Sequence, residues 1–341
     1  MGVPRRAELV LFFASLLACV VALEGAIRAD LVPLPGYVVS DGWQRERWLR
    51  RQGDAKVTKH PVDRHDARRG WTLLEGLAGV PLNGMPLHSN SAGMRGRREY
   101  ALERGKELRI VALGDSFTLG QCVGDEESFA ARLEQKLAPG EVLNLAVHGY
   151  GHDQMLLRLR EQGLAYRPDW ILLGFFNGDV ERNSLHFRDY LKPHFRLRGE
   201  RLELENVPIP SPEEFARRFQ LRSANYAEML WDRVFAKRLE RRNRRRSEAI
   251  LREIAAEGKR IGARVAFVYL PGEEQVRIGK SWPKRVYKHV CEDGEVLCID
   301  PTPRLHAFLR GEADPAAHFS CHYSAALHER VAEEIAEALP R

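Results

Sequence analysis

The stretch LRIVALGDSFTLG, residues 108–120, decides the fold of this 341-residue chain. Its first six residues form a short, almost entirely apolar run, which is typical of a parallel strand buried on both faces of its sheet. The run ends at Gly114-Asp115, and Ser116 then stands where a strand turns into a helix. A strand that passes through a tight turn into a helix is the first half of a βαβ unit, so the stretch predicts an α/β fold.

The same alternation continues toward the C-terminus. Strands that alternate with helices predict right-handed crossovers and a parallel sheet covered on both faces. Five strands suit a three-layer, flavodoxin-like order, in which a site lies beyond the carboxyl ends of the strands. After 108–113, the predicted strands are 141–147, 169–176, 263–271 and 295–300, and the clearest helical patterns are 129–137, 154–164 and 325–339.

Two segments lie outside this alternation. Residues 29–95 are rich in Pro, Gly, Arg and His without a sustained period, so we expect a linker and irregular lead-in to a main domain at 96–341. An insertion is expected at about 183–246, with a hairpin turning at Gly199-Glu200 and then a long basic helical stretch. It would lie over the end of the third strand, where it could shape a substrate groove. Its run from Arg241 to Arg246 suits a solvated helix face, and the alternative is binding of an anionic polymer or headgroup.

The N-terminus carries an uncharged apolar run, Leu9 to Leu23, after Arg5 and Arg6. A helix over this run spans about 22 Å, less than the roughly 30 Å hydrocarbon core of a bilayer. The sequence favours a signal anchor over residues 1–28, with the basic start held inside and the body extracytoplasmic, which means periplasmic in a bacterium. A cleaved signal peptide and a buried helix of a cytosolic protein are the alternatives.

Charge and cysteine content narrow the function classes. Lys and Arg number 53 against 47 Asp and Glu, and the formal charge of +6 does not demand a nucleic-acid partner. The five cysteines form no CxxC pair, and neither HExxH nor GxxxxGK[ST] occurs, so we expect no metal and no organic cofactor. In an oxidising compartment Cys291 and Cys298 could form a disulfide across a turn, and two free thiols are the alternative. The oligomeric state is not indicated.

The residues that could carry chemistry follow the predicted strands. Ser116 would expose its hydroxyl at the carboxyl edge of the sheet, where helix N–H groups can stabilise an oxyanion; an N-cap serine is the alternative. Gly149 follows the second strand and could offer a backbone N–H, or simply form a turn. Asn177 follows the third strand and could donate its amide to the oxyanion, or form an Asn-Gly turn. His322 precedes the last helix, within reach of Ser116 as a general base.

Taken as a set, these blocks resemble the SGNH (GDSL-type) hydrolase family. NSAGMRGRREY, RIVALGDSFTLG, NLAVHGYG, PDWILLGFF and HYSAALHERVA look like its membrane-anchored bacterial branch associated with polysaccharide modification. The resemblance covers about Asn90 to the C-terminus, except the insertion. It implies that Ser116 is the nucleophile, that Gly149 is the glycine of the second block, and that His322 is the catalytic histidine.

The chain departs from the family pattern at two places. The family has Asn directly before Asp in its third block, whereas here Gly178 precedes Asp179, so Asn177 needs a local shift to donate to the oxyanion. The family's acid stands two or three residues before the catalytic histidine, where this chain has Ser320 and Phe319. Four options remain: Asp314 folds back to orient His322, His318 is the working base, the site is a Ser-His dyad, or the site has decayed.

The sequence therefore predicts a membrane-anchored serine esterase, an O-acyl (acetyl) hydrolase or transferase that forms an acyl-serine intermediate. By resemblance, the substrate is an acylated cell-surface or exported glycan; from the residues alone, any small ester or acyl donor would suit the site. The alternative is a catalytically impaired protein of the same fold that binds glycan or serves polysaccharide assembly. A nucleic-acid binder would rest on the arginine run alone, and we expect no nucleic-acid partner.

Overall fold

A five-stranded, all-parallel sheet forms the centre of the chain in a computed structural model that describes residues 4–51, 57–281 and 285–340. The strand order is β11-β10-β7-β5-β6, so the first strand of the sheet lies between the second and the third. This is the flavodoxin-like order predicted from the sequence, and the five predicted strands are all present. Their bounds are β5 Arg109–Leu113, β6 Glu141–Asn144, β7 Trp170–Phe175, β10 Arg264–Tyr269 and β11 Leu297–Ile299.

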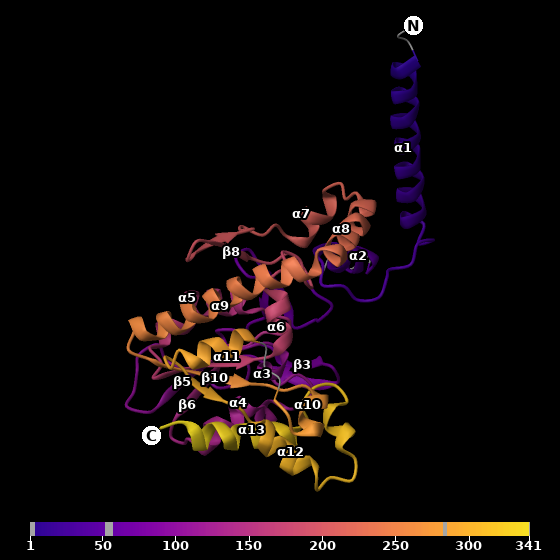
Figure 1. Cartoon of the computed structure of the whole chain (residues 1–341). Helices are drawn as coiled ribbons and strands as arrows, with labels where there is room; N and C mark the ends of the chain where they lie inside the picture. The colour runs from indigo at the N-terminus through magenta and orange to yellow at the C-terminus, as the bar shows by residue number, and fades with distance from the viewer. Residues whose placement is uncertain (1–3, 52–56, 282–284, 341) are drawn as a thin grey trace.

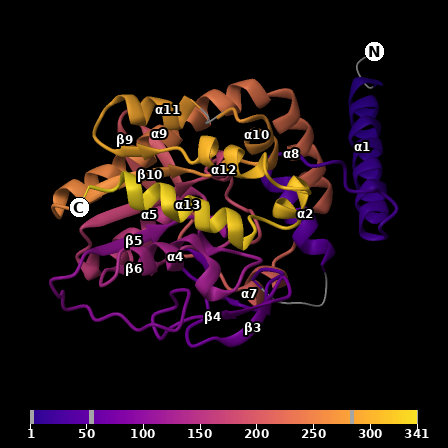
Figure 2. The same ribbon diagram turned by 90° about the horizontal axis from the view of Figure 1, so that it is seen from below.

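Helices cover both faces of this sheet, which gives the three predicted layers (Figure 1). Alternate residues of a strand point to opposite faces, so Val111 and Leu113 of β5 pack into one core while Ile110 and Ala112 pack into the other. Figure 2 shows the second layer nearest the viewer. The first layer contains α5 His152–Glu161, α9 Ala236–Arg260 and α11 Arg285–Glu292; the second contains α4 Phe129–Lys136, α10 Glu273–Ile278, α12 Thr302–Leu309 and α13 Ala325–Ala338. The shorter helical pieces are α3 Ser116–Leu119, α6 Asn177–Arg182, and the 3-10 helices η1 Asp125–Glu127, η2 Gly163–Tyr166 and η3 Pro315–Phe319.

The segment 29–95, which we expected to be a linker and irregular lead-in, is folded where the structure describes it. It forms a helix and two antiparallel hairpins, and Trp71 and Met94 are fully buried in the core beneath α5. The Trp71 indole donates to the carbonyl of His148 at 3.0 Å, and Tyr150 donates back to the Trp71 carbonyl at 2.6 Å. No period is visible in the sequence because strands this short bury at most two large side chains each. The elements are α2 Asp41–Arg50, β1 Asp63–Asp66, β2 Gly70–Leu73, β3 Ala78–Leu82 and β4 Met85–His88.

The insertion contains the predicted hairpin, with β8 His194–Arg198 paired to β9 Arg201–Glu205 around Gly199, whose φ is +60°. Two helices follow, α7 Pro212–Arg217 and α8 Arg222–Val234. The expected boundary near 246 falls inside α9, because one continuous helix carries both the arginine run and the apolar residues that cover the sheet. Arg241, Arg242 and Arg245 are exposed as expected, whereas Arg246 is buried and donates to the Asn183 carbonyl at 3.0 Å.

The N-terminal helix α1, Pro4–Arg28, projects from the body beside α8 (Figures 1 and 2). It is longer than the apolar run itself, and its segment Arg6–Arg28 has a mean hydropathy of 2.4 over the most apolar window. At about 1.5 Å per residue this segment reaches the roughly 30 Å that a membrane span needs. Residues 6–23 are exposed, so the structure does not bury this helix in a core, as the cytosolic alternative requires.

Candidate active site

Ser116 stands at the carboxyl end of β5, as the first residue of α3. Asp115 caps this helix, because its carboxylate accepts the backbone N–H of Phe117 at 2.9 Å. Glycine is required at position 114, since a Cβ there would lie 2.0 Å from the Thr118 hydroxyl. The turn is therefore tight, and it presents the serine hydroxyl at the sheet edge while the side chain remains 6% exposed.

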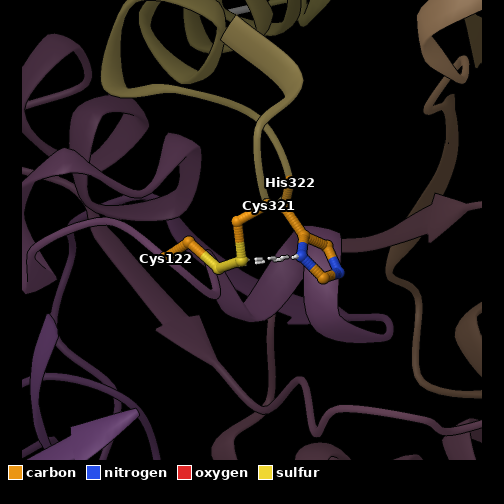
Figure 3. A group of neighbouring side chains, drawn as sticks. All are labelled: Cys122, Cys321 and His322. Atoms are coloured by element: carbon orange, nitrogen blue, oxygen red, sulfur yellow. Dashed lines mark hydrogen bonds between the residues drawn. A yellow bond between two sulfur atoms is a disulfide. The ribbon is translucent and has the colours of Figure 1, made fainter. Parts of the chain in front are cut away.

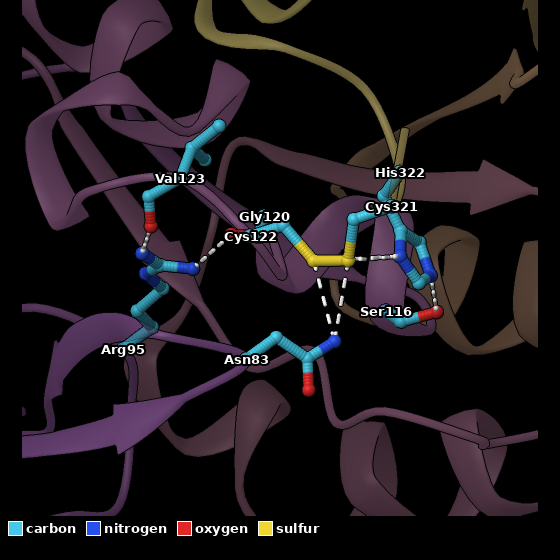
Figure 4. The surroundings of a disulfide bond; sticks show 8 residues. All are labelled: Asn83, Arg95, Ser116, Gly120, Cys122, Val123, Cys321 and His322. Carbon is cyan, nitrogen blue, oxygen red and sulfur yellow. Dashed lines mark hydrogen bonds between the residues drawn. A yellow bond between two sulfur atoms is a disulfide. The ribbon is translucent and has the colours of Figure 1, made fainter. Parts of the chain in front are cut away.

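His322 lies directly beside this serine, although the two residues are far apart in the sequence. Its Nε2 is 2.9 Å from Ser116 Oγ, the distance of a hydrogen bond through which a proton can move (Figure 4). The imidazole also packs edge-on against the ring of Phe117, with 4.8 Å between ring centroids. The structure thus brings together the two residues proposed from the sequence as nucleophile and base.

A disulfide, and not a carboxylate, lies behind the imidazole. Cys122 and Cys321 are bonded to each other, and their sulfurs lie 3.8 and 3.6 Å from His322 Nδ1 (Figure 3). The Asn83 amide donates to both sulfurs from the other side, at 3.3 and 3.2 Å (Figure 4). The bond joins the loop after α3 to the residue before His322, so it fixes the loop of the base to the loop of the nucleophile. This pair was not predicted from the sequence, although both cysteines adjoin the blocks that carry Ser116 and His322.

Asp314 and His318 do not replace the family's acid or base in this structure. Asp314 is exposed and caps η3, because its carboxylate accepts the backbone N–H of Ala316 at 3.2 Å. No hydrogen bond or ion pair joins it to His322 in the described chain. His318 faces away from the serine: its Nδ1 is 2.7 Å from Ser324 Oγ and its Nε2 is 3.5 Å from Glu312. In this structure both side chains make local contacts around η3, and neither contacts His322 or Ser116 among the described hydrogen bonds and ion pairs.

The third nearby histidine, His328, is fully buried, and its Nδ1 accepts the backbone N–H of Phe129 at 3.2 Å. Burial lowers the pKa of His328 to about 3, so this imidazole stays neutral and serves the core. It connects α13 to α4 and is not part of the Ser116–His322 pair.

A buried charged network supports the serine turn from below. Arg182 donates to the Asp115 carboxylate at 2.8 Å, to the Tyr150 carbonyl at 2.9 Å, and to Asp179. Burial, followed by the charge of Asp115, raises the pKa of Asp179 well above its ordinary value. Arg182 therefore holds α6 against the serine turn through Asp115, and Asp179 pairs with Arg182 within α6. The role of Arg182 was not predicted from the sequence, because it depends on α6 lying beside α3.

Two of the proposed oxyanion donors are backbone groups without acceptors. In the described chain, neither the Ser116 N–H nor the Gly149 N–H donates a hydrogen bond to protein. Gly149 has a φ of +75°, and a Cβ there would lie 2.7 Å from Asp189 and 2.8 Å from Arg188, so only glycine fits. Asn177 is placed differently, because its amide donates to the Tyr269 hydroxyl at 3.3 Å. This bond uses one of the two N–H donors of the amide, and donation of the other to an oxyanion stays a prediction.

The environment of His322 predicts the pH dependence of any reaction that uses it as a base. Burial lowers the pKa of His322 below its usual value of about 6.5, Asp115 opposes the shift, and Arg182 adds to it. A lowered pKa leaves the imidazole neutral at lower pH, so kcat/KM for an ester should be level above neutrality. It should fall about tenfold per pH unit below the pKa. A kcat/KM profile whose acid limb has its midpoint above pH 7 would contradict this environment.

Ester turnover should depend on the Cys122–Cys321 disulfide, and the second disulfide of the chain provides a matched control. Cys122→Ser with Cys321→Ser should lower ester turnover by on the order of 10- to 100-fold, because the loop that positions His322 is released. The matched control is Cys291→Ser with Cys298→Ser: this pair forms the disulfide that the sequence left open, with a Cα–Cα distance of 5.9 Å, between α11 and β11. The control should leave kcat nearly unchanged. Equal losses in kcat for the two double variants would show that the first acts only through general stability.

The fold and the site together define an α/β protein with a serine-hydrolase arrangement, a Ser-His pair at the carboxyl edge of a parallel sheet. No family model and no curated protein matches the chain. Among solved structures it is similar to the acetylxylan esterase Axe2 from Geobacillus stearothermophilus, at 20% identity over 69% of this chain and 94% of that one, with a TM-score of 0.40.

Two further solved structures show the same similarity. TesA is 15% identical over 68% of this chain and 97% of its own, with a TM-score of 0.39. A lipolytic protein assigned to the G-D-S-L family, from Desulfitobacterium hafniense DCB-2, is 15% identical over 68% of this chain and all of its own, with a TM-score of 0.38. The chain is thus similar to GDSL-type (SGNH) hydrolases, and the case for its chemistry rests on the geometry at Ser116.

Proposed function

We propose that this chain is a membrane-anchored serine esterase or O-acyltransferase that acts on an acylated cell-surface or exported glycan. The observation that carries the proposal is the 2.9 Å contact between Ser116 Oγ and His322 Nε2, beside two backbone N–H groups without acceptors. An N-cap serine in a structural turn needs neither a buried imidazole on its hydroxyl nor free donors next to it.

The first half of the reaction forms an acyl-serine. Neutral His322 takes the hydroxyl proton through Nε2 while Ser116 Oγ attacks the ester carbonyl carbon. The N–H groups of Ser116 and Gly149 donate to the carbonyl oxygen as it becomes negative. The ester C–O bond then breaks, and His322 returns its proton to the leaving alcohol oxygen.

The second half releases the acyl group to an acceptor. Water or a sugar hydroxyl loses its proton to His322 and attacks the acyl carbon, and the bond to Ser116 Oγ breaks as the serine regains a proton. Hydrolysis and transfer differ only in the acceptor. The site works as a Ser-His dyad in this scheme, with the Cys122–Cys321 disulfide and the Phe117 ring holding the imidazole in place of an acid.

Helix α1 supports the proposed membrane-anchored, extracytoplasmic position of the domain. The helix from Arg6 to Arg28 is long and apolar enough to cross a membrane, which favours an anchor, and two disulfides suit an oxidising, extracytoplasmic compartment. An exported or cell-surface glycan would meet the site there. The glycan as substrate comes from the resemblance of the sequence blocks.

Covalent labelling tests the proposal directly. A fluorophosphonate probe reacts with a serine hydroxyl only when a base activates it, so the full-length protein in detergent should be labelled at Ser116. The labelled peptide identifies the residue by mass spectrometry. Absence of label at Ser116 in the folded, oxidised protein would favour the second function, a glycan-binding or assembly protein. The observation that favours this second function is the lack of a carboxylate behind His322.

A further inference from the structure

A second cluster of reactive side chains lies in the insertion, away from Ser116. His186, His194 and Glu205 each point one ligand atom to a common space, and these atoms all lie within 4.8 Å of one another. His186 follows α6, His194 begins β8, and Glu205 ends β9 directly opposite His194 in the hairpin register. Two ligands on one zinc ion lie roughly 3.3 Å apart at tetrahedral geometry. The three ligand atoms would have to move closer together, and the rings of His186 and His194, which stack with 4.0 Å between their centroids, would have to rotate.

The histidine at the centre of this cluster has no partner for either nitrogen. His194 is 4% exposed, and neither Nδ1 nor Nε2 makes a hydrogen bond in the described chain. Glu205 Oε2 lies 3.8 Å from His194 Nδ1, beyond hydrogen-bond distance. A buried polar group without a partner costs free energy of folding, so an imidazole in this state indicates a missing ligand.

The second histidine has a carboxylate on one ring nitrogen, as metal-bound histidines do. His186 Nδ1 lies 2.9 Å from one oxygen of Asp41, and the other oxygen accepts the backbone N–H groups of His186 and Phe187 at 2.7 and 2.8 Å. A carboxylate on one ring nitrogen leaves the other nitrogen to the metal and fixes the tautomer. Asp41 belongs to α2, in the segment expected to be a linker.

The third ligand and the access route complete the arrangement. Arg196 binds Glu205 Oε1 at 2.8 Å, which leaves Oε2 turned to His194. All three side chains line a cavity of about 1470 Å³ between the insertion, α6 and α9, so an ion can enter from solvent. Two imidazoles and a carboxylate are the ligand set that zinc favours when it keeps an open position.

We propose that His186, His194 and Glu205 bind one zinc-class divalent ion, with Asp41 orienting His186. The ion joins the β8–β9 hairpin to the segment after α6 and, through Asp41, to α2. Because α6 begins at Asn177, the site lies one short helix from the catalytic edge of the sheet. The site is independent of the esterase chemistry, since neither Ser116 nor His322 contributes to it.

Metal binding by the full-length protein in detergent tests this site. The protein is treated with chelator, kept oxidised so that Cys122 and Cys321 remain bonded, and titrated with Zn²⁺ against a chromogenic chelator, with bound metal measured per chain. The wild type should bind one equivalent, and His194→Leu should lose it. Asp41→Asn should weaken binding by about 10- to 100-fold. His289→Leu is the matched control, since His289 pairs with Glu248 in another His–carboxylate contact outside the cavity.

Thermal unfolding separates loss of the site from loss of the fold. His194→Leu should keep the Tm of the metal-free protein, because the removed imidazole makes no hydrogen bond, while the rise in Tm that Zn²⁺ gives the wild type should disappear. Co²⁺ in the same site should give visible bands that His289→Leu retains and Glu205→Gln alters. Zinc binding by the wild type that is absent, or equal in His194→Leu, would overturn the proposal.

Discussion

Ser116→Ala should reduce ester turnover by at least about 10⁴-fold while leaving the protein folded. The expected size follows from serine hydrolases, in which removal of the nucleophile leaves only the contribution of binding and of the oxyanion donors. Folding should be unaffected, because the Ser116 hydroxyl contacts His322 alone among the described side chains, and Asp115 still caps α3. The measurement is p-nitrophenyl acetate hydrolysis by the wild type and the variant, with thermal unfolding of both.

Ser320→Ala is the control for this substitution. Ser320 is exposed and stands two residues before His322, where the family has its acid, so its loss should change turnover by less than about twofold. Wild-type turnover that Ser116→Ala leaves intact would show that the ester is cleaved elsewhere on the protein. That result would contradict the Ser-His dyad, the acyl-serine intermediate and the proposed transfer to an acceptor.

The sheet and the catalytic pair were predictable because their signals are local. Each strand is a short apolar run that ends in a turn, and Ser116, Gly149 and Asn177 each follow such a run directly. Parallel strands bring these ends to one edge whatever the rest of the chain does. His322 was predictable for the same reason, since it precedes the last helix of the same alternation.

The remaining features depend on pairings across long stretches of sequence. Cys122 and Cys321 are 199 residues apart, and only the placement of two loops beside each other makes them partners. Residues 29–95 lack a period because their strands are short, and the small core that they form joins residues from separate strands and loops, such as Val62, Leu73 and Leu87. The His194 cluster was invisible for a further reason: Asp41 and Glu205 join it from segments that the sequence marks as linker and insertion.

Replacement of the two neighbouring histidines should give opposite results. His322→Ala should lower kcat by about 10³- to 10⁴-fold, because Ser116 then has no base and the leaving group has no acid. His318→Ala should lower kcat by less than about threefold, since His318 contacts Ser324 and Glu312 and not Ser116. Steady-state kinetics with one small ester, at a pH above the pKa of His322, compares the two variants directly.

Rescue of the His322→Ala variant by free imidazole tests whether His322 acts as the base. Imidazole added to this variant should restore part of the turnover, because the space beside Phe117 and the disulfide is then open to a free base of the same chemistry. It should restore nothing to Ser116→Ala, which lacks the nucleophile. If His318→Ala were the more damaged of the two variants, the loop between η3 and α13 would have to present His318 to the serine during turnover. The short contact seen between His322 and Ser116 would then belong to a resting state only.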